Sequence, residues 1–152
     1  MKILALDLAT KTGWATSAGH TSGVQTFDVK RGESPGMRFL RCRAWLNDML
    51  QLLGGIDIIV YEQAHHRGGA ATACCVGLVS TVQAFAAEHG IELMAVHTGE
   101  LKRWATGKGN ANKPAMIEAA RARGWVPFDD NEADAELLLE YAMATLQEAP
   151  NE

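Results

Sequence analysis

The first thirty residues alternate between short apolar runs and turn-forming residues. Residues 2–8 are mostly apolar and are followed by small polar residues, which is typical of a buried strand. Residues 12–17 and 23–29 have the composition of two further strands, and small polar residues with glycine lie between them. The pattern therefore predicts an antiparallel meander of three strands at the start of the chain.

Helical periodicity begins after this meander. Ser-Pro-Gly at 34–36 opens a segment in which apolar residues recur at helical spacing as far as the glycine pair at 54–55. Residues 56–62 are nearly continuous in apolar residues, as in a central strand of a sheet. The later elements are expected to be a helix from 70 to about 89, a strand at 91–96, and helices at 100–105, 113–123 and 131–147. Strands and helices in this order predict an α/β fold.

The length and composition fit one domain. The chain has 152 residues, of which 47% are hydrophobic and 21% are charged, and this is a globular composition. No internal repeat, low-complexity tract or long linker divides the sequence. We therefore expect a single domain over residues 1–148, followed by a frayed tail at 149–152.

Cysteine usage and hydropathy indicate where the protein works. The three cysteines are an odd number and two of them are adjacent, so no disulfide framework is expected and a reducing, cytoplasmic setting is favoured. An acid within the first apolar run argues against a signal peptide. No stretch approaches the ~18 apolar residues of a membrane span, so we expect no membrane partner.

Charge is distributed unevenly around a net value of −4. Residues 101–125 carry six Lys and Arg against one acid, whereas residues 126–152 carry eight acids and no Lys or Arg. A basic segment beside an acidic one suits a protein that contacts phosphates and also binds a divalent metal. On charge alone, a solvated basic face followed by an ordinary acidic helix is the simpler interpretation.

Three carboxylates stand on otherwise apolar elements. Asp7 lies within the first strand and Glu62 ends the central strand. Burying a carboxylate is costly unless it is paired, so each marks either a functional site or a strand end that reaches water. Asp134 lies in the last helix between two alanines, and Asp130 and Asn131 precede it at helical spacing. Acids at a helix start also act as caps, which is the alternative for this group.

These three acids, Asp7, Glu62 and Asp134, are far apart in sequence but would converge at one end of a sheet. Carboxylate oxygens suit Mg²⁺ or Mn²⁺ and do not suit zinc. Two such ions ~4 Å apart activate a water molecule and stabilise the leaving oxygen of a phosphodiester. The pattern therefore predicts a metal-dependent site for cleaving phosphodiesters.

The same segments resemble the motifs of RuvC-type Holliday-junction resolvases. The opening motif of this family resembles Ile3-Leu4-Ala5-Leu6-Asp7-Leu8-Ala9-Thr10-Lys11-Thr12-Gly13-Trp14-Ala15. Its second acidic motif resembles Val60-Tyr61-Glu62-Gln63, and its C-terminal motif resembles Glu132-Ala133-Asp134-Ala135. The order and spacing of the three motifs agree over nearly the whole chain, and the sequence is most similar to short members carried by phages or prophages.

The resemblance implies an RNase H-like fold, with a mixed five-stranded sheet and helices on both faces. It also implies a homodimer that resolves four-way DNA junctions by paired nicks leaving 5′ phosphates. Two Mg²⁺ ions per site are expected, with Mn²⁺ able to substitute, and no nucleotide cofactor. The helix from residue 70, rich in small apolar residues, would supply the dimer interface or a central core helix.

Basic residues near these motifs are candidates for DNA binding. The resemblance places Lys102 and Lys113 in the basic loop and helix with which the family contacts the DNA backbone, and Lys108 is an additional candidate. The loop after the Glu62 strand supplies three more side chains, His65, His66 and Arg67. Glycines beside them would allow close approach to DNA, and an ordinary surface loop is the alternative.

One position departs from the family pattern. The family has an acid or His three residues before the final Asp, whereas this chain has Asn131, with Asp130 one step earlier. Either Asp130 takes the role, or Asn131 ligates through its uncharged carbonyl and the second ion is held more weakly. Asn131 also makes a non-catalytic, junction-binding dimer conceivable.

Two other families share the opening motif. It also resembles YqgF-type proteins, so a related nuclease acting on RNA or on other branched DNA is an alternative. It is similar, too, to the first strand and turn of actin-like kinases. That fold needs two such domains to enclose ATP, and 152 residues provide only one.

Overall fold

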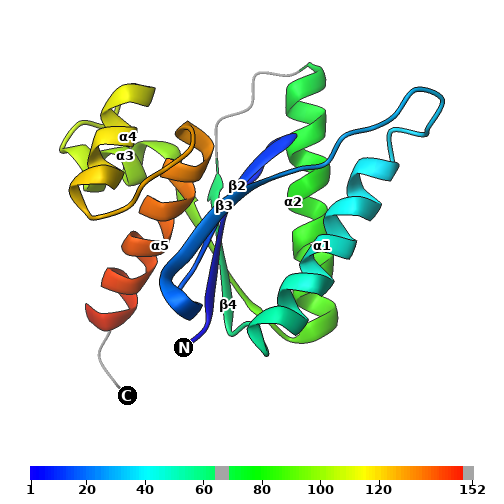
Figure 1. The fold of residues 1–152 in the computed structure, drawn as a ribbon, viewed down its shortest axis with the longest axis horizontal. Helices are drawn as coiled ribbons and strands as arrows, with labels where there is room; N and C mark the ends of the chain where they lie inside the picture. Colours follow the sequence, from blue (N-terminus) through cyan, green and yellow to red (C-terminus); the bar gives the residue numbers. More distant parts are fainter. Residues whose placement is uncertain (64–68, 149–152) are drawn as a thin grey trace.

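The computed structural model describes residues 1–63 and 69–148, which form one sheet with helices packed against it (Figure 1). The strands are β1 (Ile3–Asp7), β2 (Lys11–Thr16), β3 (Thr21–Thr26), β4 (Ile58–Gln63) and β5 (Glu92–His97). The helices are α1 (Met37–Leu53), α2 (Ala70–His89), α3 (Thr98–Thr106), α4 (Lys113–Ala122) and α5 (Asp130–Glu148), with a short 3₁₀ turn η1 (Ala18–His20). The expected tail at 149–152 lies outside the described residues.

The sheet is mixed and has the strand order β3-β2-β1-β4-β5. β1, β2 and β3 are antiparallel neighbours, whereas β1 pairs in parallel with β4, and β4 in parallel with β5. The meander and the five-stranded mixed sheet are therefore as predicted. β1 and β4 lie in the middle, which explains why both read as nearly continuous apolar runs in the sequence.

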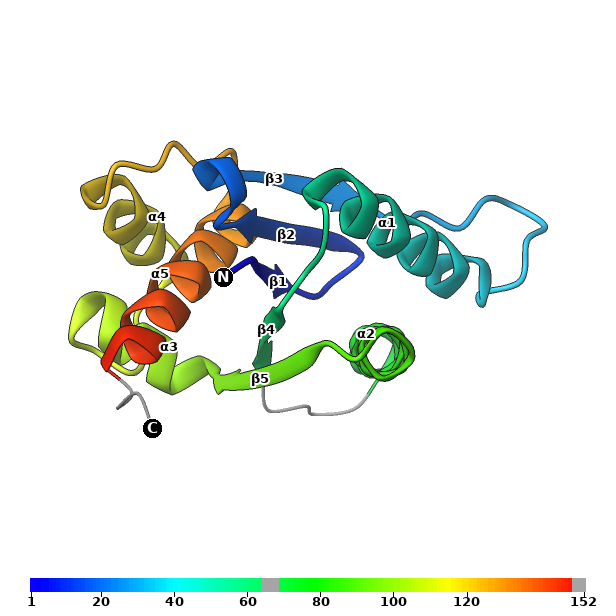
Figure 2. The same cartoon turned by 90° about the horizontal axis from the view of Figure 1, so that it is seen from below.

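Alternation along the central strands divides the core between the two faces. Ile3 and Ala5 pack into a cluster with α3, α4 and α5, while Leu4 and Leu6 pack with α1 and α2. Figure 2 shows the two helical layers on opposite sides of the strands. A side chain's parity along β1 or β4 thus decides which helical layer it meets.

The third strand departs furthest from the sequence-based expectation, and most other elements are shifted by one or two residues. The third strand, expected at 23–29, is β3 at Thr21–Thr26, because η1 turns the chain within four residues and pairing resumes at once, with Thr16 opposite Thr21. Phe27 then leaves the sheet and is buried in the core beside α1. The first long helix begins at Met37, because residues 34–36 form a turn before it.

Helix α2 corrects the expectation about membrane-like segments. It is long and apolar enough to cross a membrane by length and composition, with a mean hydropathy of 1.6, and only 22% of that segment is buried. Its buried side chains, among them Leu78 and Phe85, join the core with α1. Its exposed side carries small and polar residues, including Ala73, Ser80 and Gln83. The high hydropathy thus comes from a core stripe together with an exposed alanine-rich face.

Candidate metal centre

Asp7 and Glu62 lie side by side at the ends of the two central strands. β1 and β4 are parallel neighbours in a register that pairs Leu6 with Tyr61, so the next residue on each strand is one of the two acids. Both have the parity that points toward the α5 layer. Two carboxylates on neighbouring parallel strands are therefore aimed at the same side of the sheet.

Helix α5 brings the third carboxylate, Asp134, to the same side. Asp129 caps the helix, because its Oδ1 accepts a 2.9 Å hydrogen bond from the backbone N–H of Glu132. Glu132 in turn accepts a 2.8 Å bond from the backbone N–H of Phe128. These two bonds fix the start of α5, and Asp134 follows one turn later on a helix packed over β1 and β2.

The three carboxylates meet as predicted. Each of Asp7, Glu62 and Asp134 offers an oxygen, and the three oxygens all lie within 4.8 Å of one another. Glu62 Oε2 and Asp134 Oδ1 are buried and have no hydrogen-bond partner among the described residues. Buried carboxylate oxygens without donors are costly, and a hard divalent cation is the partner that satisfies several of them at once. The donor set therefore fits Mg²⁺ or Mn²⁺.

Burial, together with mutual repulsion, shifts the acids toward their neutral forms. Burial, followed by the charges of Glu62 and Asp134, raises the pKa of Asp7 well above its ordinary value. Burial, followed by the charges of Glu62 and Asp130, raises the pKa of Asp134 to about 8. Groups shifted so far by burial and like charge are typical of functional sites, because ordinary structural acids avoid such surroundings.

Helix α3 supplies two groups that act on Glu62. Burial raises the pKa of Glu62, while a hydrogen bond from Thr98 and the positive charge of Lys102 oppose that shift. The Thr98 hydroxyl donates to Glu62 Oε1 at 2.6 Å. Lys102 also lowers the pKa of Asp134, so one lysine acts on two of the three acids.

A cleft of about 300 Å³ opens beside the acids. It is lined by Glu62, Thr98, Lys102, Ala111, Asn112, Lys113, Met116, Asp130 and Asp134. Three acids line it together with Lys102 of α3 and Lys113 of α4. Lys108 lies in the adjoining hollow formed by the loop before α4. The three lysines expected to contact DNA thus lie in or next to the cleft.

The structure distinguishes Asp130 from Asn131, the two residues considered as the fourth metal ligand. Asp130 lines the cleft, raises the pKa of both Asp7 and Asp134 by its charge, and lies 3.7 Å from Lys113 Nζ. Asn131 does not line this cleft, and its backbone carbonyl faces Gly13 of β2. This geometry favours Asp130, and the role of Asn131 stays a prediction.

Three of the expected DNA contacts are untested. His65, His66 and Arg67 lie outside the described residues. Gln63, the last described residue before them, lies at the acid end of β4, and Gly69 begins the described chain again just before α2.

Thr98 was missed by the sequence analysis. A threonine at the start of a helix is ordinarily interpreted as a cap or a surface residue. The only available signal was that it follows the last strand, β5, directly. Its contact with Glu62 depends on the strand register, which the sequence pattern does not give.

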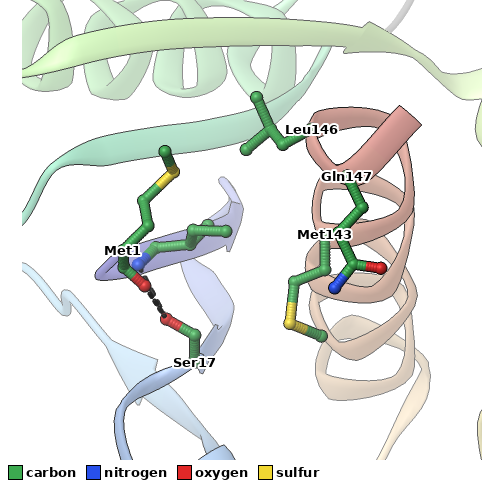
Figure 3. Close-up of a pocket in the computed structure, with 6 residues that line it drawn as sticks. Met1, Ser17, Met143, Leu146 and Gln147 are labelled. Atoms are coloured by element: carbon green, nitrogen blue, oxygen red, sulfur yellow. Dashed lines mark hydrogen bonds between the residues drawn. The ribbon is translucent and has the colours of Figure 1, made fainter. Parts of the chain in front are cut away.

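A second pocket lies at the opposite end of the sheet. It has a volume of about 290 Å³ and lies between the beginning of β1 and the last turns of α5 (Figure 3). Met1, Ile3, Met143 and Leu146 give it a mainly apolar lining, and Ser17 donates a hydrogen bond to the Met1 carbonyl. It contains no carboxylate, histidine or cysteine, so it does not compete with the acid cluster as a catalytic site.

Comparison with known proteins supports the fold. No family model and no curated protein matches the sequence. Among solved structures, RuvC from Thermus thermophilus in complex with a Holliday-junction substrate is 17% identical, with a TM-score of 0.76, and the match covers 97% of this chain and 96% of that one. A second Thermus thermophilus RuvC structure is 18% identical, with a TM-score of 0.73 and the same coverage. The chain therefore has the RNase H-like fold, as in RuvC.

Proposed function

We propose that this protein is a divalent-cation-dependent DNA endonuclease that resolves four-way junctions. The observation that carries the proposal is the meeting of Asp7, Glu62 and Asp134 within 4.8 Å, at the ends of two central strands and beside a basic cleft. The likeness in fold to a RuvC bound to a Holliday junction supports the same substrate class. Paired nicks would leave 5′ phosphates and 3′ hydroxyls.

The backbone holds the three acids in a geometry suited to binding a cation. The sheet fixes Asp7 and Glu62, and the capped start of α5 fixes Asp134. The three carboxylates therefore need little rearrangement to bind a shared cation. We expect Asp130 to complete the set for a second ion. When bound, Mg²⁺ or Mn²⁺ ions lower the pKa of the attacking water and neutralise the departing 3′ oxygen.

The lysines of the cleft orient the DNA backbone. Lys102 of α3 and Lys113 of α4 both line the cleft, and Lys108 extends the positive charge into the adjoining loop. Phosphates would be drawn toward these lysines, and the scissile phosphate toward the cation-loaded acids. Positive residues thus place a substrate that the carboxylates alone would repel.

Two copies of the chain would be needed for symmetric cleavage. The alanine-rich face of α2 is exposed in the single chain, although the helix has a mean hydropathy of 1.6. A second copy packed on this face would bury small side chains, which allow helices to approach closely. We propose that α2 forms a homodimer interface, which would give one active centre for each of two opposed DNA strands.

The decisive experiment compares wild type with Asp7→Asn on a synthetic immobile four-way junction. Wild type should nick opposed strands only when Mg²⁺ or Mn²⁺ is present, and Asp7→Asn should bind the junction with similar affinity but not cleave it. Duplex, flap and structured RNA substrates belong in the same panel. Preferred cleavage of RNA or flap DNA would indicate the YqgF-like alternative, and binding without any cation-dependent nicking would indicate a non-catalytic junction-binding protein.

A further inference from the structure

One side chain outside the acid cluster fixes the orientation of Glu62. The Thr98 hydroxyl donates to Glu62 Oε1 at 2.6 Å, while the other oxygen, Oε2, is buried and has no partner in the described part of the chain. The same hydroxyl lies 3.5 Å from the Gln63 carbonyl, a weaker geometry for its single hydrogen. One carboxylate oxygen is thus occupied and the other is left available.

The backbone sets this contact. β4 and β5 are parallel, and their register pairs Gln63 with His97, so Thr98 is the first residue beyond β5 and lies beside the end of β4. Thr98 also begins α3, and Lys102 follows four residues later on the same side of the helix. Both residues line the cleft. Helix α3 therefore presents a neutral donor and a cation toward the acids.

The hydroxyl has no separate structural task in α3. The residue before it, His97, is the N-cap of the helix and makes no capping hydrogen bond with its side chain. Within residues 1–63 and 69–148, the hydrogen bonds of the Thr98 hydroxyl run to β4 and not to the helix's own N–H groups. A threonine retained only to start the helix would be expected to bond back to the helix.

We propose that Thr98 is a positioning residue for cation binding. It holds Glu62 through Oε1 and so aims Oε2 at Asp7 and Asp134. Without this bond the Glu62 side chain can rotate. Cation binding must then order it, and this loss of conformational entropy weakens binding. The inference rests on the proposed function, because it assigns Thr98 to the same site.

The test measures Mg²⁺ binding to the DNA-free protein by calorimetry. Thr98→Val keeps the shape but removes the donor, and it should weaken Mg²⁺ binding about tenfold or more, the usual effect of losing a group that orients a ligand. Thr98→Ser retains the hydroxyl and should bind nearly as tightly as wild type. Thr21→Val is the matched control, since Thr21 is exposed at the opposite end of the sheet.

Cleavage provides a second measurement. In Thr98→Val the Mg²⁺ concentration for half-maximal rate should rise by the same factor, while the rate at saturating Mg²⁺ stays close to wild type. Equal Mg²⁺ affinity in the valine and serine variants would overturn the inference. If Thr98→Val fails to fold by circular dichroism, Thr98→Ala takes its place, and wild-type affinity in that variant would overturn the inference equally.

The two proposals fail in different ways. If wild type does not bind Mg²⁺, or if Asp7→Asn binds it equally well, the proposed function itself is wrong. If wild type binds Mg²⁺ and Asp7→Asn does not, but removing the Thr98 hydroxyl changes nothing, only the role of Thr98 is wrong.

Discussion

Gly13 of β2 lies directly against the Asn131 carbonyl group in the first turn of α5. A methyl group on Gly13 would overlap that carbonyl oxygen and would lie 2.8 Å from the backbone nitrogen of Glu132. Gly13 also pairs with Asp7 across the β1–β2 ladder. One position without a side chain therefore sets how closely the helix carrying Asp134 approaches the strand carrying Asp7.

Gly13→Ala should separate these two elements. We expect the free energy of unfolding to fall by about 1–3 kcal/mol, the usual cost of overpacking a close contact, and Mg²⁺ affinity to fall with it. Urea denaturation and calorimetric Mg²⁺ titration measure the two effects. Gly36→Ala is the control, because the added carbon there would lie 3.5 Å from Ser34 Oγ, an ordinary contact. A Gly13→Ala protein with unchanged stability and affinity would refute the close approach.

The stability of the cation-free protein should decrease as pH rises. The pKa of Asp134 is raised to about 8 and that of Asp7 is also raised, so the folded state holds more protons than the unfolded state from about pH 4 to about pH 8. The free energy of unfolding therefore falls through that window. Added Mg²⁺ should raise Tm more at about pH 8.5 than at about pH 6, as scanning calorimetry can show.

Asp134→Asn isolates the cause of this pH effect. The amide cannot ionise, so the variant should be more stable than wild type near pH 9 without divalent cation, by at least about 1 kcal/mol, which corresponds to about one pKa unit of relieved shift. Its Tm should no longer respond to Mg²⁺. A variant that is less stable than wild type under these conditions would show that Asp134 is held by donors and not strained by neighbouring charges.

Two buried glutamates on α5 share one serine hydroxyl. Ser22 Oγ lies 2.6 Å from Glu132 Oε2 and 2.7 Å from Glu136 Oε2, but it carries a single hydrogen. A proton on one carboxyl lets both contacts be hydrogen bonds, and burial raises the pKa of Glu136 to about 7. Since this folded-state pKa is above the ordinary value of 4.5, the stability that the proton provides is lost as pH rises through about 7.

Glu136→Gln should remove that loss. Its amide is neutral and donates to Ser22 at every pH, so the variant should be more stable than wild type at about pH 8 and nearly equal at about pH 5. Ser22→Ala removes the shared partner and should lower the free energy of unfolding by about 1–3 kcal/mol at pH 8. Urea denaturation at the two pH values measures both. Equal pH dependence in wild type and Glu136→Gln would place the proton elsewhere.

Lys113 should contribute to DNA affinity through a contact with the phosphate backbone. Lys113→Ala should weaken junction binding and reduce the slope of log affinity against log salt by about one, because one phosphate contact is lost. Lys30→Ala, which changes an exposed lysine in the loop before α1, is the comparison. Titrations at several salt concentrations distinguish the two variants. A salt slope that is equal in both would remove Lys113 from the DNA-contacting set.

The sequence pattern predicted most elements because their signals are local. The apolar runs of β1 and β4 and the glycines after α1 and α2 are contained in short windows, so their positions came out within a few residues. The strand β3 was displaced because the tight turn η1 is encoded by backbone geometry at Gly19 and His20, where φ is positive. The search for an unbroken apolar run likewise overlooked α2, whose mean hydropathy of 1.6 is spread among small and polar residues.

The candidate site was predicted only in part for a related reason. Asp7, Glu62 and Asp134 could be found because a charged residue contrasts with an apolar surrounding. The contact of Thr98 depends on strand register, and the choice between Asp130 and Asn131 depends on the rotation of α5. The residue pattern indicates neither of these. Gly13 carries no chemistry of its own, and its importance arises from what packs against it.

The three acids of the cluster are spread along the chain, from the first strand to the last helix. Asp7 is made early in translation and Asp134 only with α5, which also buries the face of β1 that carries Asp7. A nascent polypeptide that ends before α5 would contain Asp7 and Glu62 of the cluster but would lack Asp134 and leave this face of β1 uncovered. The complete three-carboxylate cluster would thus form only when the last helix docks.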